Sequence, residues 1–447
     1  MAGHPNVIFV FSDQQRVQDV GYMGNKDVKT PFLDAMSKES VSFELAVAGS
    51  PVCSPYRASL ITGQYPLTHK VIVNDVTLSN DAESIAQVYS SAGYDTAYIG
   101  KWHLDGHGRS NFIPKERRQG FDYWKVLECT HDYNNSPYYG DENIKLKWDG
   151  YDAEAQTRDA QEYIKNRNKG KPFLLMLSWG PPHNPYETAP ERFRAMYDPD
   201  KITLRPNVPP ELAEKSRKEL AGYYAHVSAV DYLMGEIINT IDNEGLRDNT
   251  ILVFTSDHGD MIGSQGERRK QRPWDESILT PFLLRYPALL GNEQKKISMP
   301  INTPDIMPTL LELSGLPVPK TVEGMSYRPF ITGDKKEEDI AALIQCSHPF
   351  GEFTRQTGGK EYRGIRTMRY TYTRDLKGPW LLYDNQEDPY QMKNLVGVAG
   401  YKDLTDRLDR DLQSILDKRG DKFLQGEEYM KSFGYPMDAT GTVPFTM

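Results

Sequence analysis

The chain has 447 residues and carries 53 lysines and arginines against 62 aspartates and glutamates, so its formal net charge is −9. This negative charge argues against general binding to nucleic acid or other polyanions, so an anionic substrate would have to be held by a local basic pocket. The length exceeds what one hydrophobic core usually serves, and we therefore expect two domains.

Composition excludes several other classes of protein. Apolar residues make up 38% of the chain, and no run approaches the roughly eighteen apolar residues of a membrane-spanning helix, so we expect no membrane span. The three cysteines, Cys53, Cys129 and Cys346, lack the spacing of a metal cluster and cannot form a disulfide framework. The first predicted strand begins close to Met1, so no secretory leader is visible. A full native sequence of this kind would be cytoplasmic.

Strands and helices alternate through most of the chain. A continuous apolar run predicts a buried strand over Asn6–Phe11, and Thr30-Pro31 then opens a helix that extends to Ser40. The other predicted elements are helix Ser84–Ser91, strand Thr96–Gly100, strand Phe173–Trp179, a long helix from about Pro210 to Ile241, strand Thr250–Thr255 and strand Phe282–Tyr286. Such alternation predicts an α/β fold, with a mostly parallel sheet covered by helices on both faces.

The pattern changes after about residue 335. Lys335–Asp339 is a charged stretch, and the runs Arg363–Tyr372 and Trp380–Tyr383 predict short antiparallel strands, followed by a helix over Lys402–Arg419. We therefore expect a catalytic α/β domain over residues 1–335 and a smaller α+β domain over residues 336–447 that completes the substrate pocket.

Polar residues follow the predicted strands at their carboxyl ends. They are Asp13 and Gln14 after the first strand, Lys101 and His103 after the second, His183 after the third, and Asp257 and His258 after the fourth. Sheets of this type bind ligands beyond the carboxyl ends of their strands. The sequence therefore predicts one site to which four strand ends contribute.

A cysteine stands where a further helix should begin. Cys53 would lie at the positive end of that helix dipole with Arg57 one turn on, an arrangement that favours an anionic group. A lone cysteine is more often a small buried apolar residue. However, Cys53-Ser54-Pro55-Tyr56-Arg57, followed by Ala58-Ser59-Leu60-Ile61-Thr62-Gly63, resembles the signature of the formylglycine-dependent type I sulfatases.

This resemblance, to bacterial carbohydrate sulfatases in particular, implies a fold like that of alkaline phosphatase. It also implies that a formylglycine-generating enzyme or a radical maturase oxidises Cys53 to formylglycine (3-oxoalanine), whose hydrate is the nucleophile. Arg57 would stabilise that nucleophile. The family resemblance suggests a periplasmic or extracellular location and leaves a homo-oligomer open.

The predicted metal site combines oxygen and nitrogen donors. Asp13, Gln14 and Asp257 offer oxygens that suit Ca²⁺, although each Asp alone could be a turn cap. By resemblance, these three, His258 and Cys53 occupy the family's metal positions. Many members have a second Asp in place of Gln14 and an Asn in place of His258. Because imidazole is an unusual calcium ligand, Mn²⁺ or another divalent ion stays an alternative, as does a role for His258 in orienting Asp257.

Three more motifs, Gly100–Leu104, Pro181–Pro185 and Lys270–Pro281, contain predicted catalytic residues. In Gly100-Lys101-Trp102-His103-Leu104, alternation along an extended segment points Lys101 and His103 the same way. The resemblance implies that Lys101 and Lys270 bind sulfate, that His103 acts as a base on the hydrate, and that His183 protonates the leaving alcohol. The alternatives are an exposed lysine, loop histidines bonded to the backbone, and a solvated charge run around Lys270.

The substrate is the least determined part of the prediction. His131 lies in the segment Cys129–Tyr139, which is rich in groups that stack on sugar rings but also resembles a tyrosine-rich surface loop. Arg272, His348 and Arg355 are further candidates for substrate binding. We expect a sulfatase acting on a sulfated sugar or polysaccharide fragment. The alternatives are a phosphonate or phosphate ester hydrolase, an aryl or alkyl sulfatase, and a non-catalytic protein that binds sulfated glycans.

Overall fold

The computed structural model describes residues 4–446. Its centre is an eight-stranded sheet in the order β12-β2-β11-β9-β1-β8-β4-β5. In that order the strands span Lys295–Ile297, Val41–Phe43, Leu283–Arg285, Thr250–Ser256, Asn6–Asp13, Phe173–Pro182, Asp95–Lys101 and Tyr123–Leu127. The five from β9 to β5 run parallel, whereas β11 runs antiparallel to both neighbours. The predicted mostly parallel sheet is confirmed.

The register of the central strands brings their polar ends together. β1 pairs with β9 from Asn6 opposite Thr250 to Ser12 opposite Ser256, and it pairs with β8 on its other side. The residues directly after β9 therefore lie beside those at the end of β1. This alignment brings polar residues from distant parts of the chain to one edge of the sheet.

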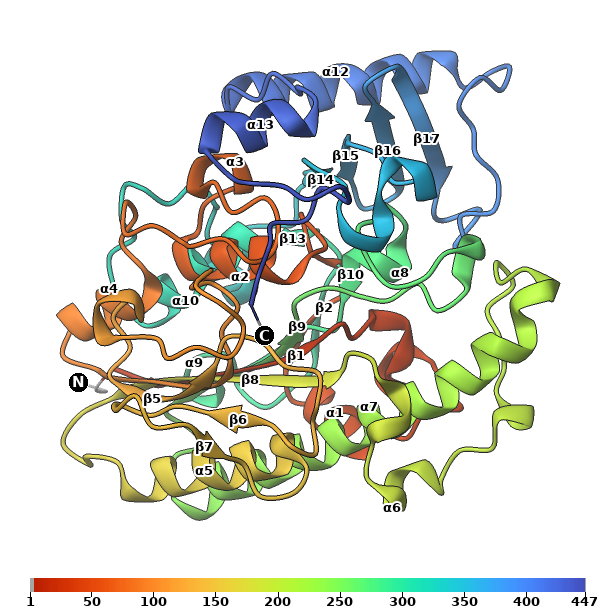
Figure 1. Cartoon of the computed structure of the whole chain (residues 1–447). Helices are drawn as coiled ribbons and strands as arrows, with labels where there is room; N and C mark the ends of the chain where they lie inside the picture. Colours follow the sequence, from red (N-terminus) through yellow and green to blue (C-terminus); the bar gives the residue numbers. More distant parts are fainter. Residues whose placement is uncertain (1–3, 447) are drawn as a thin grey trace.

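Helices cover both faces of the sheet, as the strand-helix alternation predicts (Figure 1). On β1, Val7, Phe9 and Phe11 pack into one core cluster and Ile8 and Val10 into a second one, because successive side chains point to opposite faces. The first cluster includes α2 (Cys53–Thr62), α4 (Ile85–Ser91) and α10 (Thr303–Leu313), and the second includes α1 (Pro31–Ser37), α5 (Asp152–Asn166) and α7 (Ala213–Asn243).

A separate antiparallel sheet follows the large one in the chain. Its strands, in order, are β14 (Ala342–Cys346), β15 (Tyr362–Arg366), β16 (Tyr370–Asp375) and β17 (Gly378–Asp384). The helix α12 (Lys402–Lys418) packs Leu408, Leu412 and Leu416 against it, and α13 (Gly426–Phe433) comes after. The predicted antiparallel sheet and helix are confirmed, while the domain boundary near residue 335 stays a prediction.

The remaining elements are short. They are β3 (Ala46–Val47), β10 (Leu279–Thr280), β13 (Ile301–Asn302), β6 (Pro137–Tyr138), β7 (Leu146–Lys147), α3 (Pro66–His69), α6 (Glu191–Arg194), α8 (Asp275–Ile278), α9 (Pro287–Leu290) and α11 (Arg328–Thr332). The long helix starts later than predicted, because Pro210 begins a 3-10 turn before Ala213. Among residues 4–446, no helix combines the length and the apolar character that crossing a bilayer requires.

One buried histidine on α7 makes stability depend on pH. His226 accepts a hydrogen bond from the Tyr151 hydroxyl at 2.7 Å and donates one to the Pro185 carbonyl at 3.1 Å. Burial lowers its pKa to about 4. An unfolded histidine titrates near 6.5, so between these values the unfolded chain binds a proton that the folded chain does not. The free energy of unfolding is therefore at its full value above about pH 6.5, and it decreases as the pH falls towards 4, because protonation of His226 favours the unfolded chain.

We expect His226→Gln to reduce the acid sensitivity of folding. Urea unfolding at pH 7 and pH 4.5 should show that the wild type loses about 2 to 3 kcal/mol more than the variant between these pH values. His4→Gln, at an exposed histidine, serves as the control and should keep the wild-type slope. An unchanged slope in His226→Gln would contradict the assignment.

Candidate active site

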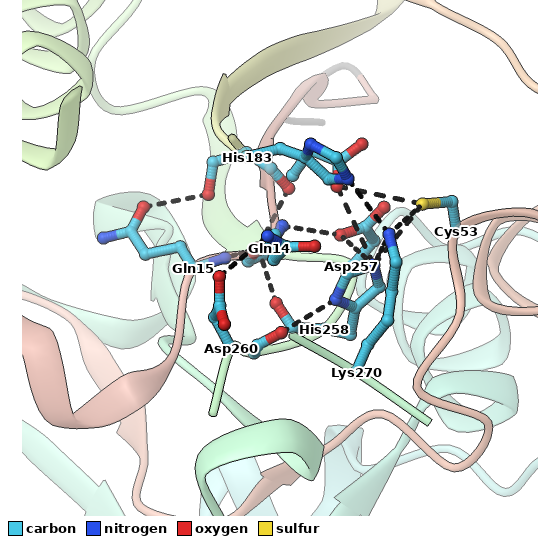
Figure 2. Close-up of polar contacts among 12 residues, drawn as sticks. Gln14, Gln15, Cys53, His183, Asp257, His258, Asp260 and Lys270 are labelled. Atoms are coloured by element: carbon cyan, nitrogen blue, oxygen red, sulfur yellow. Dashed lines mark hydrogen bonds and ion pairs between the residues drawn. The ribbon is translucent and has the colours of Figure 1, made fainter. Parts of the chain in front are cut away.

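Cys53 lies at one side of a buried polar cluster and directs its sulfur into it (Figure 2). It is the first residue of α2 and is 1% exposed. Its Sγ lies 3.1 Å from Lys270 Nζ, 3.4 Å from His258 Nε2 and 3.7 Å from Lys101 Nζ. The Ser54 amide is held by Asn74 Oδ1 at 3.1 Å, which fixes the first turn of the helix. The helix start therefore presents Cys53 to three nitrogen groups.

The charges around Cys53 favour an anion at this position. Burial, together with the Asp13 carboxylate, raises the pKa of the thiol. The ammonium groups of Lys101 and Lys270, and then His258, outweigh this and hold the pKa well below its ordinary value. The positive end of the α2 dipole acts in the same direction. The site therefore stabilises a negatively charged oxygen or sulfur where Sγ lies.

Four buried residues could share a metal ion. Donor atoms of Asp13, Cys53, Asp257 and His258 all lie within 4.8 Å of one another. His258 Nδ1 donates to the Gly259 carbonyl at 2.9 Å, so Nε2 faces the carboxylates. Burial lowers the pKa of His258, but the Asp257 charge raises it overall, so a cation bound at Nε2 would replace a proton there. These oxygen and nitrogen donors fit a divalent cation.

Gln14 adds a further candidate donor. Its side-chain nitrogen donates to Asp260 Oδ2 at 2.8 Å, which fixes the amide orientation. Its Oε1 is buried and has no hydrogen-bond partner. An unsatisfied buried oxygen is costly unless a ligand completes it, so this atom also fits a cation ligand.

The two metal-site carboxylates have opposite pKa shifts. Burial raises the pKa of Asp13, but Lys101, with Nζ 2.6 Å from Oδ2, brings it well below the ordinary value. Burial and the neighbouring Asp13 charge raise the pKa of Asp257. Arg57 bridges them, with Nη2 3.3 Å from Asp13 and 3.1 Å from Asp257. Asp13 is therefore ionised, and a bound cation would lower the raised pKa of Asp257.

The end of β4 directs three consecutive side chains to different environments. Lys101 points into the cluster, whereas Trp102 is fully buried against Tyr98 and Trp124. His103 Nε2 lies 3.4 Å from Asp75 Oδ1, and its buried Nδ1 has no partner. Burial lowers the pKa of His103, but the charge of Cys129 and the hydrogen bond to Asp75 raise it to about 9.

The residues after β8 form the opposite wall of the site. His183 Nδ1 donates to the Asn184 carbonyl at 2.8 Å, and its Nε2 accepts from Lys270 Nζ at 3.1 Å. The His131 ring stacks on it, with centroids 4.1 Å apart and planes 2° apart. Burial, and then the charges of His131 and Lys270, hold the pKa of His183 well below its ordinary value. The lowered pKa keeps His183 neutral.

Three predicted substrate-binding residues lie outside the cluster. Arg272 donates to Glu267 at 3.0 Å and lies beside a cavity of about 310 Å³ that Phe353 also lines. Arg355 forms ion pairs with Glu361 and Glu427. His348 is buried, with Nε2 3.1 Å from the Gly441 carbonyl. Among the described residues none of the three contacts Cys53, because each is already engaged elsewhere. Their role in substrate binding stays a prediction.

Several polar residues of the site could not be predicted from the sequence. Asp75 and Arg109 lie in irregular segments with no strand or helix pattern, and Asp260 follows the predicted pair Asp257-His258 at a short interval. Ser178 Oγ lies 2.7 Å from Arg57 Nη1, inside a strand that reads as uniformly apolar. An Asn74-Asp75 turn signal was the one available hint for Asp75.

Comparison with known proteins agrees with this geometry. The family profile described as Sulfatase matches residues 5–316, and the profile described as N-sulphoglucosamine sulphohydrolase, C-terminal, matches residues 263–418. The chain is 44% identical over 438 residues to an ulvan-active sulfatase from Formosa agariphila, covering 96% of this chain and 84% of the relative. It is 33% identical over 481 residues to an endo-4-O-sulfatase from Bacteroides thetaiotaomicron, covering 94% and 93%.

Solved structures show the same fold. A structure described under the metabolism of multiple glycosaminoglycans by Bacteroides thetaiotaomicron superposes with a TM-score of 0.86 at 30% identity, covering 96% of this chain and 99% of that one. A phosphonate monoester hydrolase of Agrobacterium radiobacter, at 24% identity and a TM-score of 0.77 over 93% and 96% of the two chains, shares the fold alone. The chain belongs to the sulfatase family, a family of sulfuric ester hydrolases.

Proposed function

We propose that the protein hydrolyses a sulfate ester on a sulfated sugar or polysaccharide fragment, using a formylglycine hydrate made from Cys53 and a bound divalent cation. The observation that carries this proposal is the convergence of Lys101, Lys270 and the Asp13–Asp257 pair on a buried Cys53 at a helix start. Relatives named for sulfated glycans support the substrate class. They include the ulvan-active sulfatase, the endo-4-O-sulfatase and an N-acetylglucosamine-6-O-sulfatase that is 26% identical.

The two groups added to the chain would supply chemistry that its side chains lack. When present, the aldehyde hydrate supplies a nucleophilic oxygen with a second hydroxyl for product release, and the cation polarises sulfate oxygens. Gln14 Oε1 and His258 Nε2 would hold the cation together with the two carboxylates. Ca²⁺ is our first choice, and the imidazole donor keeps Mn²⁺ as the alternative.

The cationic side chains would bind the sulfate group. Lys101 and Lys270 each hold an ammonium within 3.7 Å of Sγ, where the oxygens of an approaching sulfate would lie. Arg57 is fixed by the Lys101 carbonyl at 2.8 Å and by Ser178, so it needs no reorganisation to stabilise negative charge. Preorganised cations of this kind favour the transition state over free substrate.

Two histidines would move protons on opposite sides of the sulfate. Lys270 Nζ donates to His183 Nε2, and a sulfate oxygen would accept a hydrogen bond from that ammonium instead. The negative substrate would then raise the pKa of His183, so Nε2 could carry the proton to the leaving alcohol. His103 would act as the base through Nδ1, because its Nε2 faces Asp75. Since its pKa is raised to about 9, the ring would first have to give up its proton, so this step should become faster as the pH rises.

A formylglycine-generating enzyme or radical maturase is required as a partner during maturation. A periplasmic or extracellular location follows from the same family resemblance, since sulfated polysaccharides are found outside cells.

A panel of substrates tests the function. Purified enzyme should release sulfate from at least one defined sulfated saccharide, with a kcat/KM about tenfold or more above that for a generic aryl sulfate. Phosphate and phosphonate esters in the same panel address the alternative hydrolase, whose fold the chain shares. Faster turnover of a phosphonate ester, or release of sulfate from no member of the panel, would reject the proposal.

A further inference from the structure

The last described residues leave the small sheet and cross to the large domain. The Gly351 amide donates to the Thr440 carbonyl at 3.1 Å, and His348 contacts the Gly441 carbonyl. In Figure 1 this dark-blue segment runs down from α13 and ends over the middle of the molecule in this view. Val443 is buried in the same core cluster as α2. The segment 440–446 therefore anchors at both domains.

The end of this segment packs on Arg109. The guanidinium carbon of Arg109 lies 3.5 Å from the centroid of the Phe445 ring. The Arg109 amide donates to the Thr446 carbonyl at 2.8 Å. Gly108 has a φ of +105°, and a Cβ there would lie 2.4 Å from Thr446 Oγ1, so a side chain at 108 would collide with the segment. Both the side chain and the backbone of Arg109 are thus held by residues 445 and 446.

Arg109 in turn holds the partner of His103. Its Nε and Nη2 donate to the two oxygens of Asp75 at 2.9 and 2.8 Å, a bidentate geometry that fixes the carboxylate plane. Asp75 Oδ1 is also the atom that lies 3.4 Å from His103 Nε2. The contacts therefore run from Phe445 through Arg109 and Asp75 to His103.

The backbone at both ends of the Asp75–His103 contact needs support. Asp75 has a φ of 63° and His103 a φ of 59°, the left-handed region that side-chain-bearing residues seldom adopt. Such conformations persist only when surrounding contacts hold them, and they cluster at functional sites. The Asp75 side chain is 4% exposed and that of Arg109 is 18% exposed, so water competes little for the pair.

We propose that Arg109 is a positioning residue that fixes Asp75 and thereby His103, and that Phe445 and Thr446 hold Arg109 in place. The effect of Arg109 on turnover rests on the proposed function of His103. The effect of Arg109 on the positions of Asp75 and His103 does not depend on that function. The segment 440–446 therefore helps to position a residue of the active site, although it lies far from Cys53 in the chain.

Kinetics with a sulfate ester substrate test the effect on turnover. Arg109→Lys keeps the charge but cannot make the bidentate contact, and Phe445→Ala removes the stacked ring. We expect kcat to fall about 10- to 100-fold in the first and less in the second, with KM within about twofold, because displacing a catalytic group by about 1 Å costs this much. Phe445→Trp should restore most of the kcat lost in Phe445→Ala.

Hydrogen exchange tests the structural part without any substrate. In Phe445→Ala and Arg109→Lys, peptides that contain residues 73–76 and 102–110 should exchange faster than in the wild type, while peptides of β9 should not change. This measurement keeps the inference testable even if the enzyme is inactive on every ester tried.

A second aromatic-arginine-carboxylate arrangement offers matched controls. Tyr390 is 37% exposed against 38% for Phe445, and its ring centroid lies 4.9 Å from the guanidinium carbon of Arg205, which pairs with Glu276. Tyr390→Ala should leave kcat and exchange at residues 102–110 unchanged. Arg369→Lys, which alters a bidentate pair with Asp384 in the small sheet, is the control for Arg109→Lys.

Two results would overturn the inference. A higher KM with unchanged kcat in Arg109→Lys would mean that Arg109 binds substrate directly. Unchanged exchange at residues 73–76 and 102–110 in both variants would show that neither residue holds Asp75 or His103.

Discussion

Cys53→Ala should lower kcat/KM for the preferred sulfate ester by about 100,000-fold, because removing a nucleophile leaves only binding and the surrounding charges to act. Cys53→Ser should be nearly as inactive if the oxidised residue, rather than any hydroxyl, is required. Nitrogen atoms of Lys101, Lys270 and His258 all lie within 3.7 Å of Cys53 Sγ. The substitution therefore removes the atom that these three groups face.

Cys346→Ala is the matched control. Cys346 is also a buried free cysteine, but burial raises the pKa of its thiol to about 12, and it lies in β14 of the small sheet. Its substitution should leave kcat/KM within about twofold. Peptide mass spectrometry should find residue 53 as an aldehyde in active enzyme. Full activity from protein whose residue 53 is an unmodified thiol would refute the nucleophile assignment.

Loss of the cation should have the second largest effect. Asp257→Asn, or prolonged chelation, is expected to lower kcat about 1,000-fold, since a bound cation contributes several kcal/mol to stabilising negative charge. The variant also removes the full charge that faces Arg57 Nη2 at 3.1 Å. Elemental analysis should show that the same treatment removes a stoichiometric divalent ion.

Adding metals back identifies the ion and tests the His258 donor. Chelated wild type should regain activity with Ca²⁺ or with Mn²⁺, and His258→Asn should shift the preference towards Ca²⁺, because an amide oxygen replaces the ring nitrogen. Asp384→Asn, which alters an ion pair with Arg369 in the small sheet, should respond to chelation as the wild type does. Metal-free protein with undiminished kcat would contradict the metal site.

The sequence was most informative where strands end. Residues after β1, β4, β8 and β9 could be assigned to one crevice because parallel strands share a carboxyl edge, and the structure brings Asp13, Lys101, His183 and Asp257 within one cluster. The α2 start at Cys53 followed from its motif. These features depend on local pattern and on chain direction, both of which a sequence displays.

Long-range ion pairs could not be predicted in the same way. Arg355 stays a predicted substrate-binding residue, but its ion pairs with Glu361 and Glu427 could not be read from the sequence. Asp75 and Arg109 gave no periodic signal, and only folding brings Phe445 to them. The strand β14 and the helix α13 were also missed, because their composition does not stand out from the loops around them.

The depth of Cys53 constrains the order of events in biosynthesis. With 1% of its surface accessible and its backbone already in a helix, this residue can be reached by another protein's catalytic pocket only on a chain that has not yet collapsed. The oxidation of Cys53 that we propose would therefore compete with folding for the same nascent polypeptide. A cell that synthesised the chain faster than it oxidised Cys53 would then accumulate folded but inactive protein, so the yield of active enzyme would depend on the rate of synthesis as well as on sequence.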